Sequence, residues 1–322
     1  MTEPVVEATE VGKTFGDVVA LDRVSIQVPP NTVLGLLGHN GAGKTTLINI
    51  LTTMITPSAG TARVAGFDVV GQSKQVRRRI GLTGQLASVD EDLTGRANLV
   101  MIARLLGATR RQARTRAAEL LEVFGLTEAA DRAVGGYSGG MRRRLDLAAG
   151  LVGLPQVVFL DEPTTGLDPG SRAAMWEIVQ RLVAEGTTVL LTTQYLDEAD
   201  RLADSIVVLS RGRVTASGTP TELKSQVGQQ SLSIRLRSAS AVSAAFTAIR
   251  QAGFGPSRDD SRQLVVTPLE HSSRMAAVVR ALDDARIEPA ELALTEPTLD
   301  DVYLALTGSG DAVAEAHSGV PT

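Results

Sequence analysis

The sequence has no cysteine and few aromatic residues, and both absences restrict what the protein can be. None of its 322 residues is a cysteine, so a disulfide framework and a thiolate metal site are excluded. Aromatic residues make up 3% of the chain and the formal net charge is −4. This composition argues against a protein that reads nucleic-acid bases by stacking them on an electropositive sheet. We therefore expect no nucleic-acid partner.

Long apolar runs are missing as well. No stretch reaches the roughly 18 to 20 consecutive apolar residues that a membrane-spanning helix needs. The first residues, MTEPVVEATEVGKTFG, lack the basic start and apolar run of a secretory signal. We expect a chain that stays in the cytoplasm and takes any membrane role from a partner. Lysine is also scarce, because the chain contains only Lys13, Lys44, Lys74 and Lys224.

Apolar runs of strand length alternate with helical patterns along most of the chain. TVLGLLG, QVVFLDE and TTVLLTT are mainly apolar, as expected for a mostly parallel sheet covered on both faces. From about Thr94 to Gly125, alanine, arginine, leucine and glutamate recur at helical spacing. A smaller series of strands and helices begins with SLSIRLRS, and the chain ends in a small, polar stretch. We predict an α/β domain over residues 4–226 with a helical subdomain at about 86–155, a small α/β accessory or assembly domain over 227–307, and a disordered tail over 308–322.

A phosphate-binding loop follows the first apolar strand. GHNGAGKTT matches the pattern G-x-x-x-x-G-K-[ST], and the loop lies between a strand and a helix, as the motif requires. The order disfavours an ordinary glycine-rich turn, and the segment resembles the phosphate loop of P-loop NTPases, which implies a core of the RecA-like type. Its backbone N–H groups and helix N-terminus would bind phosphate, Lys44 would reach the β and γ phosphates, and Thr45 would bind Mg²⁺. The nucleotide-binding set is Gly38, His39, Asn40, Gly41, Ala42, Gly43, Lys44, Thr45 and Thr46, with His39 expected to fill a variable position rather than act as a base.

Two carboxylates stand where another buried strand ends, in VVFLDEPTTGLD. Asp161 can hold Mg²⁺ directly or through water, and Glu162 can polarise an attacking water. A different interpretation is that the carboxylates cap the next helix. The phosphate loop favours the catalytic interpretation, in which Glu162 acts together with Lys44.

A second anion-binding helix start lies between these two sites, in YSGGMRRRLDLAAGL. Ser138 followed by Gly139 and Gly140 has the residue types of such a helix N-terminus, although the motif alone would suggest an ordinary helix start. We expect the next arginines, residues 142–144, to form a solvated or dipole-compensating face rather than a lipid or phosphate contact.

In this order, GHNGAGKTT, TGQ, YSGGM and VVFLDEPTTGLD resemble the motifs of the ATP-binding subunit of ATP-binding-cassette (ABC) transporters. The resemblance implies that two cassettes pair head to tail and hydrolyse ATP with Mg²⁺ at their interface. It also implies that Ser138, Gly139 and Gly140 contact the γ-phosphate bound by the partner cassette. Tyr137 and Met141 depart from the frequent Leu-Ser-Gly-Gly-Gln form but leave its Ser-Gly-Gly core intact.

Three further positions take roles only by this resemblance. Gln85, in TGQ, would touch Mg²⁺ and link the site to the membrane subunit, and Asp168 would cross the dimer interface. Phe15 would stack on adenine, although without the family it is equally well interpreted as a core aromatic.

One position departs from the family's usual pattern. Most cassettes have a histidine after the TTVLLTT strand that touches the γ-phosphate, whereas this chain has Gln194. Its histidines, His39, His271 and His317, lie elsewhere in the sequence. By the resemblance, Gln194 takes the catalytic role of phosphate sensor as a neutral amide. The alternative is that Gln194 only caps the strand.

Finer matches point to one branch of the family. YSGGMRRRLDLAAGL, LLTTQYLDEADRLAD and EPTLDDVYLALTG resemble the actinobacterial daunorubicin and doxorubicin resistance ATP-binding proteins. This resemblance implies an exporter subunit at the cytoplasmic face of the membrane. Its partners would be a separately encoded transmembrane permease and a second copy of the cassette, and its cargo a hydrophobic or amphipathic drug or a complex lipid.

Two other interpretations stay open. One is a soluble ABC ATPase in DNA or ribosome maintenance, against which we note a single phosphate loop and no cysteine for zinc. The other is an importer subunit, which only the resemblance of the C-terminal end disfavours.

Overall fold

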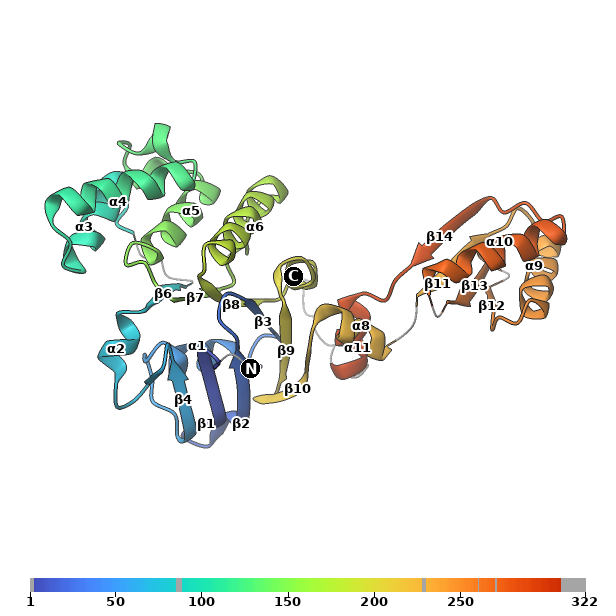
Figure 1. Cartoon of the computed structure of the whole chain (residues 1–322), viewed down its shortest axis with the longest axis horizontal. Coiled ribbons are helices and arrows are strands. Elements are labelled where there is room, and N and C mark those ends of the chain that lie inside the picture. The colour runs from blue at the N-terminus through green and yellow to red at the C-terminus, as the bar shows by residue number, and fades with distance from the viewer. Residues whose placement is uncertain (1–2, 85–88, 228–229, 260, 270, 308–322) are drawn as a thin grey trace, which may run out of the picture. The chain divides into compact units, whose positions relative to one another are not determined.

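The apolar runs of the sequence form the central sheet of the first of two units. A computed structural model describes residues 3–84, 89–227, 230–259, 261–269 and 271–307 (Figure 1). The units divide between Pro220 and Thr221, six residues before the domain boundary that we predicted at residue 226. The predicted disordered tail, residues 308–322, lies outside the described residues. None of the described helices is both long and apolar enough to span a membrane.

Six strands form the central sheet, in the order β10-β9-β3-β8-β7-β6. The strands β3, β6, β7, β8 and β9 run parallel to their neighbours, and β10 pairs antiparallel at the edge. Every residue of β3, β7 and β8 is buried, which explains why these runs are apolar throughout rather than alternating. The strands span Val33–Leu37 (β3), Ile80–Thr83 (β6), Val157–Asp161 (β7), Thr188–Thr193 (β8), Ser205–Ser210 (β9) and Arg213–Gly218 (β10).

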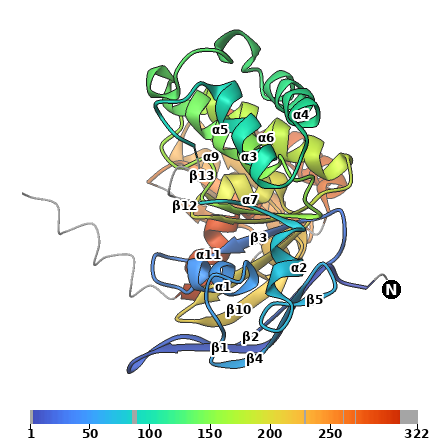
Figure 2. The same ribbon diagram turned by 90° about the vertical axis from the view of Figure 1, so that its left-hand side faces the viewer.

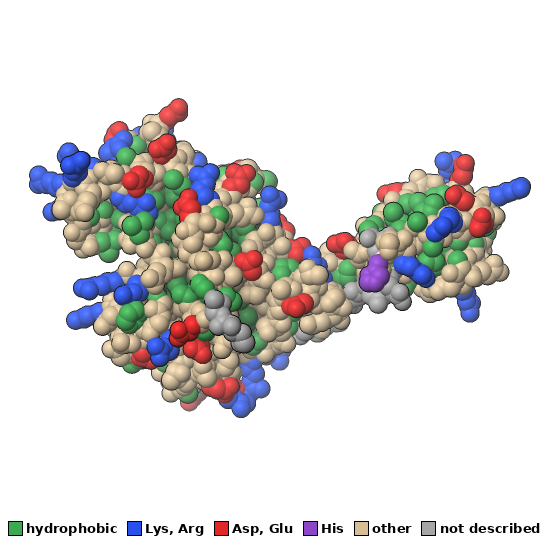
Figure 3. Space-filling view, viewed as in Figure 1, with side chains coloured by type: hydrophobic (Ala, Val, Ile, Leu, Met, Phe, Trp, Pro, Cys, Tyr) green, Lys and Arg blue, Asp and Glu red, His purple; other side chains and the backbone are tan. Residues whose placement is uncertain are grey.

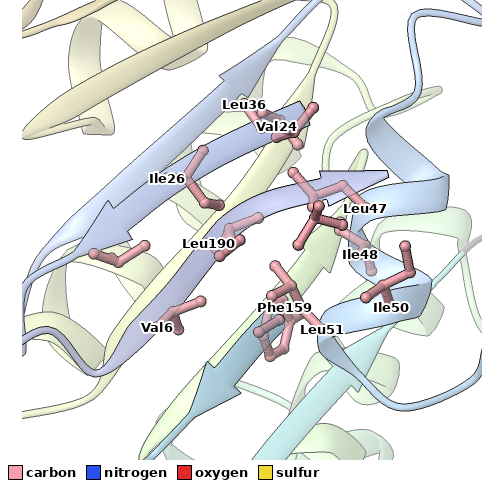
Figure 4. Close-up of a cluster of buried hydrophobic side chains, with 14 of the residues drawn as sticks. Val6, Val24, Ile26, Leu36, Leu47, Ile48, Ile50, Leu51, Phe159 and Leu190 are labelled. Atoms are coloured by element: carbon pink, nitrogen blue, oxygen red, sulfur yellow. The ribbon is translucent and has the colours of Figure 1, made fainter. Parts of the chain in front are cut away.

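A second, antiparallel sheet in the same unit has the order β2-β1-β4-β5. Its strands are β1 (Val6–Phe15), β2 (Val18–Val28), β4 (Ala59–Val64) and β5 (Phe67–Asp68). Helix α1 (Lys44–Leu51) lies between this sheet and the central one (Figure 2). Leu47, Ile48, Ile50 and Leu51 of α1 are fully buried among side chains of both sheets (Figure 4). This core fixes the helix that follows the phosphate loop.

Three helices, α3 (Gly95–Leu105), α4 (Arg110–Val123) and α5 (Gly139–Gly150), form the helical insertion (Figure 1). The helical pattern from Thr94 to Gly125 becomes two helices because the chain turns at Gly107, whose φ is 95°. Thr94, Thr109 and Ser138 each cap a helix N-terminus through their side-chain oxygens. The short segments α2 (Ser73–Arg77), η1 (Thr127–Ala129) and η2 (Val134–Gly136), with α6 (Pro169–Ala184) and α7 (Leu196–Leu202), complete this unit.

The second unit has a βαββαβ arrangement, with strand order β12-β13-β11-β14 and all pairs antiparallel. The sequence predicted a series of strands and helices here but did not reveal β12, which is only three residues long. Leu232, Ile234, Val242, Val265 and Val278 form its core. Its elements are α8 (Pro220–Val227), β11 (Ser231–Arg235), α9 (Ala239–Gln251), β12 (Ser257–Asp259), β13 (Leu264–Pro268), η3 (Ser272–Arg274), α10 (Met275–Asp284), β14 (Glu291–Thr295) and α11 (Leu299–Thr307).

Candidate nucleotide-binding site

The phosphate loop connects the end of β3 to α1, and its lysine points back over the loop. Lys44 Nζ donates to the carbonyls of Gly38, at 2.6 Å, and His39, at 3.2 Å. Burial lowers the pKa of Lys44, whereas the negative charges of Glu162 and Asp161 act in the opposite direction. The ammonium group thus lies over the loop, and the charges of the two carboxylates favour its protonated form.

Two glycines of the loop show why this backbone needs them. Gly43 has a φ of 107°, and a Cβ there would lie 2.7 Å from Leu21 Cδ2 and 2.8 Å from the Ala20 carbonyl. Gly41 also has a positive φ, 82°, but a Cβ there would meet nothing within 4 Å. Gly43 therefore packs against β2, whereas Gly41 faces open space. The His39 ring bonds only to the adjacent Asn40 carbonyl, at 2.7 Å, among the described residues, as suits a variable loop position.

Asp161 lies at the end of β7, where its carboxylate contacts side chains from β8 and α1. The carboxylate is 6% exposed and accepts a hydrogen bond from Thr192 Oγ1 at 2.5 Å. Thr45 Oγ1, from the start of α1, lies 3.4 Å from the other carboxylate oxygen. Thr45 and Asp161 thus offer two hard oxygen donors side by side, the kind of ligand that Mg²⁺ prefers. Neither Asp161 nor Glu162 caps the following helix, because Asp168 is the N-cap of α6.

Glu162 has a strained backbone that several neighbours hold in place. Its φ of 51° lies in the left-handed region, which is uncommon for residues other than glycine. Its N–H donates to Thr192 Oγ1 at 3.0 Å, and Thr165 Oγ1 donates to its carboxylate at 3.3 Å. Glu162 also borders a hollow of about 320 Å³, whose lining includes Gly139, Asp146 and Leu167. The carboxylate therefore has space beside it for a water molecule.

Arg143, on the signature helix α5, binds the backbone at this strand end. Its guanidinium donates to the carbonyls of Asp161 (3.0 Å), Glu162 (2.7 Å), Pro163 (2.9 Å) and Gly84 (2.9 Å). Burial lowers the pKa of Arg143, and the surrounding carboxylates oppose that effect. Guanidinium groups stay charged in proteins, so these are charge-assisted hydrogen bonds.

The expectation of a solvated arginine face on α5 was wrong. Arg142 pairs with Glu91 at 2.7 Å, and Arg144 donates to the Phe124 carbonyl at 3.0 Å. Together with Arg143, which reaches both Gly84 and the end of β7, they tie the helix to four separate segments. A one-residue step along an α-helix turns the side chain by about 100°, so adjacent arginines reach different neighbours.

The signature motif is built around tight packing. Ser138 caps α5 by accepting a hydrogen bond from the Met141 N–H at 3.2 Å. A Cβ on Gly140 would lie 2.5 Å from Ser171 Oγ, so this glycine permits close approach to α6. The Tyr137 hydroxyl donates to the Ala129 carbonyl at 2.7 Å, and burial raises the pKa of Tyr137. Among the described residues, no hydrogen bond connects Ser138 to the phosphate loop of the same chain.

The remaining predicted positions lie at the rim of the site or outside the description. Gln194 follows β8, is exposed, and has no hydrogen bond to another described residue, whereas Thr193 accepts from the Tyr195 N–H. Phe15, at the end of β1, is 50% exposed, with Lys13 Nζ 5.0 Å from its ring centre. Asp168 accepts from the Ser171 hydroxyl at 2.6 Å, which lowers the pKa of Asp168. Gln85 lies outside the described residues.

Glu198 of α7 is a buried acid that sequence reasoning did not identify. It is 0% exposed, and its Oε1 accepts from Trp176 Nε1 at 3.1 Å. Burial raises the pKa of Glu198, although the hydroxyls of Thr193 and Thr164 and the Trp176 indole oppose this. Oε2 and Thr164 Oγ1 are both buried and reach no partner of normal hydrogen-bond geometry in the described part of the chain.

Thr192, Arg143 and Glu198 are the three site residues that the sequence did not reveal. A weak signal existed for Thr192, because TTVLLTT ends a buried strand with two polar residues. Arg143 and Glu198 gave none, since their partners lie in other parts of the chain.

The site combines a phosphate loop with two adjacent carboxylates, and it lies on a parallel sheet with a helical insertion. These features define a nucleotide-binding ATPase cassette. The sequence model of a family described as ABC transporter matches residues 21–165. The chain belongs to this family, and it is an ABC-type ATPase that binds ATP.

Two drug-resistance proteins resemble nearly the whole chain, and an export protein resembles most of it. Daunorubicin resistance ATP-binding protein DrrA3 of Streptomyces coeruleorubidus is 49% identical over 98% of this chain and 100% of that protein. Doxorubicin resistance ATP-binding protein DrrA of Mycobacterium tuberculosis H37Rv is 48% identical over 92% of each. Nod factor export ATP-binding protein I of Paraburkholderia xenovorans is 42% identical over 71% of this chain and 75% of that protein.

Solved structures match the cassette. An ATP-binding subunit of an ABC transporter is 27% identical with a TM-score of 0.63, covering 69% of this chain and 92% of that one. CbiO1 from Clostridium perfringens, part of the ABC transporter complex cbiONQ, is 25% identical with a TM-score of 0.64, covering 70% of this chain and 92% of that one. The family and the P-loop NTPase fold predicted from the sequence are confirmed.

Changing Arg143 to Gln should lower the rate of ATP hydrolysis more than ATP affinity. A glutamine amide cannot span four carbonyls, and a hydrogen bond to a charged group contributes about 1.5–3 kcal/mol. Loss of one such bond in the transition state predicts a kcat roughly 10- to 150-fold lower. The phosphate loop is untouched, so KM for ATP should change little, and Arg143→Lys should restore part of the rate. Arg142→Gln is the matched control, since it removes only a partly exposed ion pair with Glu91.

Steady-state kinetics and thermal unfolding of the three variants separate positioning from mere stability. An Arg143→Gln protein that unfolds at a lower temperature but keeps the wild-type kcat would show that the arginine only stabilises the fold.

Changing Glu198 to Gln should remove a pH dependence of folding stability. Because the pKa of Glu198 is raised in the folded state, this residue adds to the free energy of unfolding at low pH. That contribution is lost as pH rises above about 4.3, the ordinary glutamate pKa, and through the folded-state pKa. Urea unfolding followed by fluorescence of Trp176, the only tryptophan, should show this decline in wild type and not in Glu198→Gln. The control is Glu177→Gln on the exposed side of α6. Parallel pH profiles for wild type and Glu198→Gln would contradict the assignment.

Proposed function

We propose that this chain is the ATP-hydrolysing subunit of an exporter and works with a separately encoded transmembrane subunit. The observation that carries the proposal is similarity over almost the full length to ATP-binding proteins named for drug resistance. A shorter match is to proteins named for Nod factor export. These names favour export of a hydrophobic or amphipathic compound over import or a soluble role. The cassette would lie at the cytoplasmic face of the membrane and pair with a second copy of itself.

In the proposed mechanism, the phosphate loop and Lys44 bind the phosphates of ATP. Lys44 gives up two carbonyl hydrogen bonds to the loop when it turns to the β and γ phosphates. Thr45 and Asp161 would hold Mg²⁺, which supplies positive charge that stabilises the transferring phosphate. Glu162 accepts a hydrogen bond from water and orients it for attack, from a carboxylate whose backbone is bound on both sides.

The partner cassette would complete each site. Ser138, Gly139 and Gly140 would contact the γ-phosphate held by the other chain, through the N-terminus of α5. Asp168 would lie at the interface, and the exposed ring of Phe15 would stack on adenine. The role of Gln85 at Mg²⁺ and at the permease rests on the family resemblance alone.

Gln194 would act as the γ-phosphate sensor. Its amide is exposed, follows β8 directly and makes no hydrogen bond to another described residue, so it is available to a ligand. An amide donates to a phosphate oxygen without adding charge.

Changing Glu162 to Gln should trap two cassettes around ATP, because water is no longer activated while nucleotide binding persists. Size-exclusion chromatography with ATP should show a stable dimer for Glu162→Gln and none for wild type. Cells that contain the chain and its membrane partner should export a fluorescent anthracycline, and Glu162→Gln should abolish export. Normal ATP hydrolysis by Glu162→Gln would refute the assigned catalytic role, whereas active ATPase without anthracycline export would refute the proposed cargo.

Changing Gln194 to Ala should slow hydrolysis without loss of ATP binding. Removing a hydrogen bond to a charged group costs about 1.5–3 kcal/mol, so turnover should fall roughly 10- to 150-fold. Gln194→His should remain active, since imidazole also donates to phosphate. Kinetics with a fluorescent ATP analogue measure the rate of hydrolysis and the affinity for nucleotide. A wild-type rate in Gln194→Ala would show that the residue only caps the strand.

A further inference from the structure

One stretch of the helical insertion is strongly basic in a chain of net charge −4. From Leu93 to Ala118 the sequence has six arginines and no aspartate or glutamate. Arg96 pairs with Asp131 and Arg116 with Glu119. The other four, Arg104, Arg110, Arg111 and Arg114, have no acidic partner in the described part of the chain. We refer to these four as the arginine patch.

The arginine patch surrounds the turn between α3 and α4. All four side chains are exposed, and Arg104 donates to the Ala108 carbonyl of the turn at 2.6 Å. Arginine side chains gather over this end of α3 and α4, at the left edge of the first unit in Figure 3. A second basic group lies over α2 at the same edge, where Lys74, Arg77 and Arg78 are exposed.

Exposed leucines adjoin the arginine patch. Leu105 is 80% exposed, Leu106 59% and Leu154 72%. A Cβ on Gly153 would lie 3.2 Å from Leu106 Cδ1, so the loop that carries Leu154 lies beside the turn. The surface therefore combines several apolar side chains with positive charge.

Arg104 lies in the last turn of α3, where a cation is favourable, but helix stability does not explain the three arginines of α4. Arg110 and Arg111 occupy the first turn of α4, where the positive end of the helix dipole disfavours cations. Arg110 and Arg114 are four residues apart on one face, a spacing at which like charges repel. The capping box of Thr109 and Gln112 satisfies the helix end instead. The charges on α4 thus act against the local fold, unlike the mixed signs of an ordinary solvated face.

We propose that the arginine patch and the adjoining leucines bind the anionic surface of a lipid bilayer directly. Lipid phosphates complement an acid-free cluster of guanidinium groups, and exposed leucines beside it can enter the headgroup region. The inference rests on the proposed place of the cassette at the membrane. It adds a contact with lipid that does not pass through the transmembrane subunit.

Binding of the purified full-length chain to vesicles tests this contact without permease or ATP. Vesicles of phosphatidylcholine mixed with phosphatidylglycerol should sediment the wild-type chain, and pure phosphatidylcholine vesicles should not. Each arginine near an anionic bilayer contributes about a fivefold change in partitioning. The triple variant Arg110→Gln, Arg111→Gln, Arg114→Gln should therefore bind about 100-fold more weakly. Added salt should weaken wild-type binding, and Leu105→Gln should lower the part of binding that survives in salt.

A charge-matched control separates the patch from net charge. The variant Arg237→Gln, Arg250→Gln, Arg280→Gln changes three exposed arginines of the second unit and should bind vesicles like wild type. Equal loss in both triple variants, or equal binding to the two vesicle types, would overturn the proposal. So would association only with membranes that contain the permease. The patch variant should unfold at a temperature no lower than wild type, since it loses repulsive charges, and its ATPase rate tests the proposed enzyme separately.

Discussion

A carboxylate held at the buried end of a parallel strand is the constraint on which the site depends. Asp161 is 6% exposed, and an ion removed from water is costly unless charges and hydrogen bonds compensate it. Thr192, Thr45 and Lys44 provide that compensation from β8 and α1. The pairing of Asp161 opposite Thr192 is therefore essential, because a slip of one residue would turn the threonine to the other face of the sheet.

Arg143 extends this constraint to the signature helix. The same β8 threonine that bonds Asp161 also accepts the Glu162 N–H, while Arg143 binds the Glu162 carbonyl. Glu162 is thus held on both sides in a left-handed conformation that would otherwise relax. In the proposed dimer, the N-terminus of α5 faces ATP on the partner while Arg143 binds the catalytic strand of its own chain. A shift of α5 when the partner binds nucleotide would therefore displace the Glu162 backbone of its own chain. This contact gives a physical route for coupling the two sites.

Features fixed by neighbouring residues could be predicted from the sequence, and features fixed by distant contacts could not. The phosphate loop, the strand that ends in Asp161 and the cap at Ser138 all depend on short segments, and each lies where the pattern indicated. The arginines of α5 were misinterpreted because their partners, such as Glu91 and Phe124, lie far along the chain. Strand β12 was missed because three residues carry too little pattern. Thr192 and Glu198 became significant only when β7, β8, α6 and α7 came together.

The distribution of charge connects the site to the proposed lipid contact. Helix α3 begins at Gly95, shortly after the segment that contains Gln85, and ends beside the arginine patch. Its 11 residues make a rigid rod of about 16 Å. If its C-terminal end rests on the bilayer, the rod cannot rotate freely when the other end moves. Motion of the helical insertion during the ATP cycle would then be directed toward the permease, because the subunit could not rotate freely. This role gives a reason for arginines that weaken the start of α4.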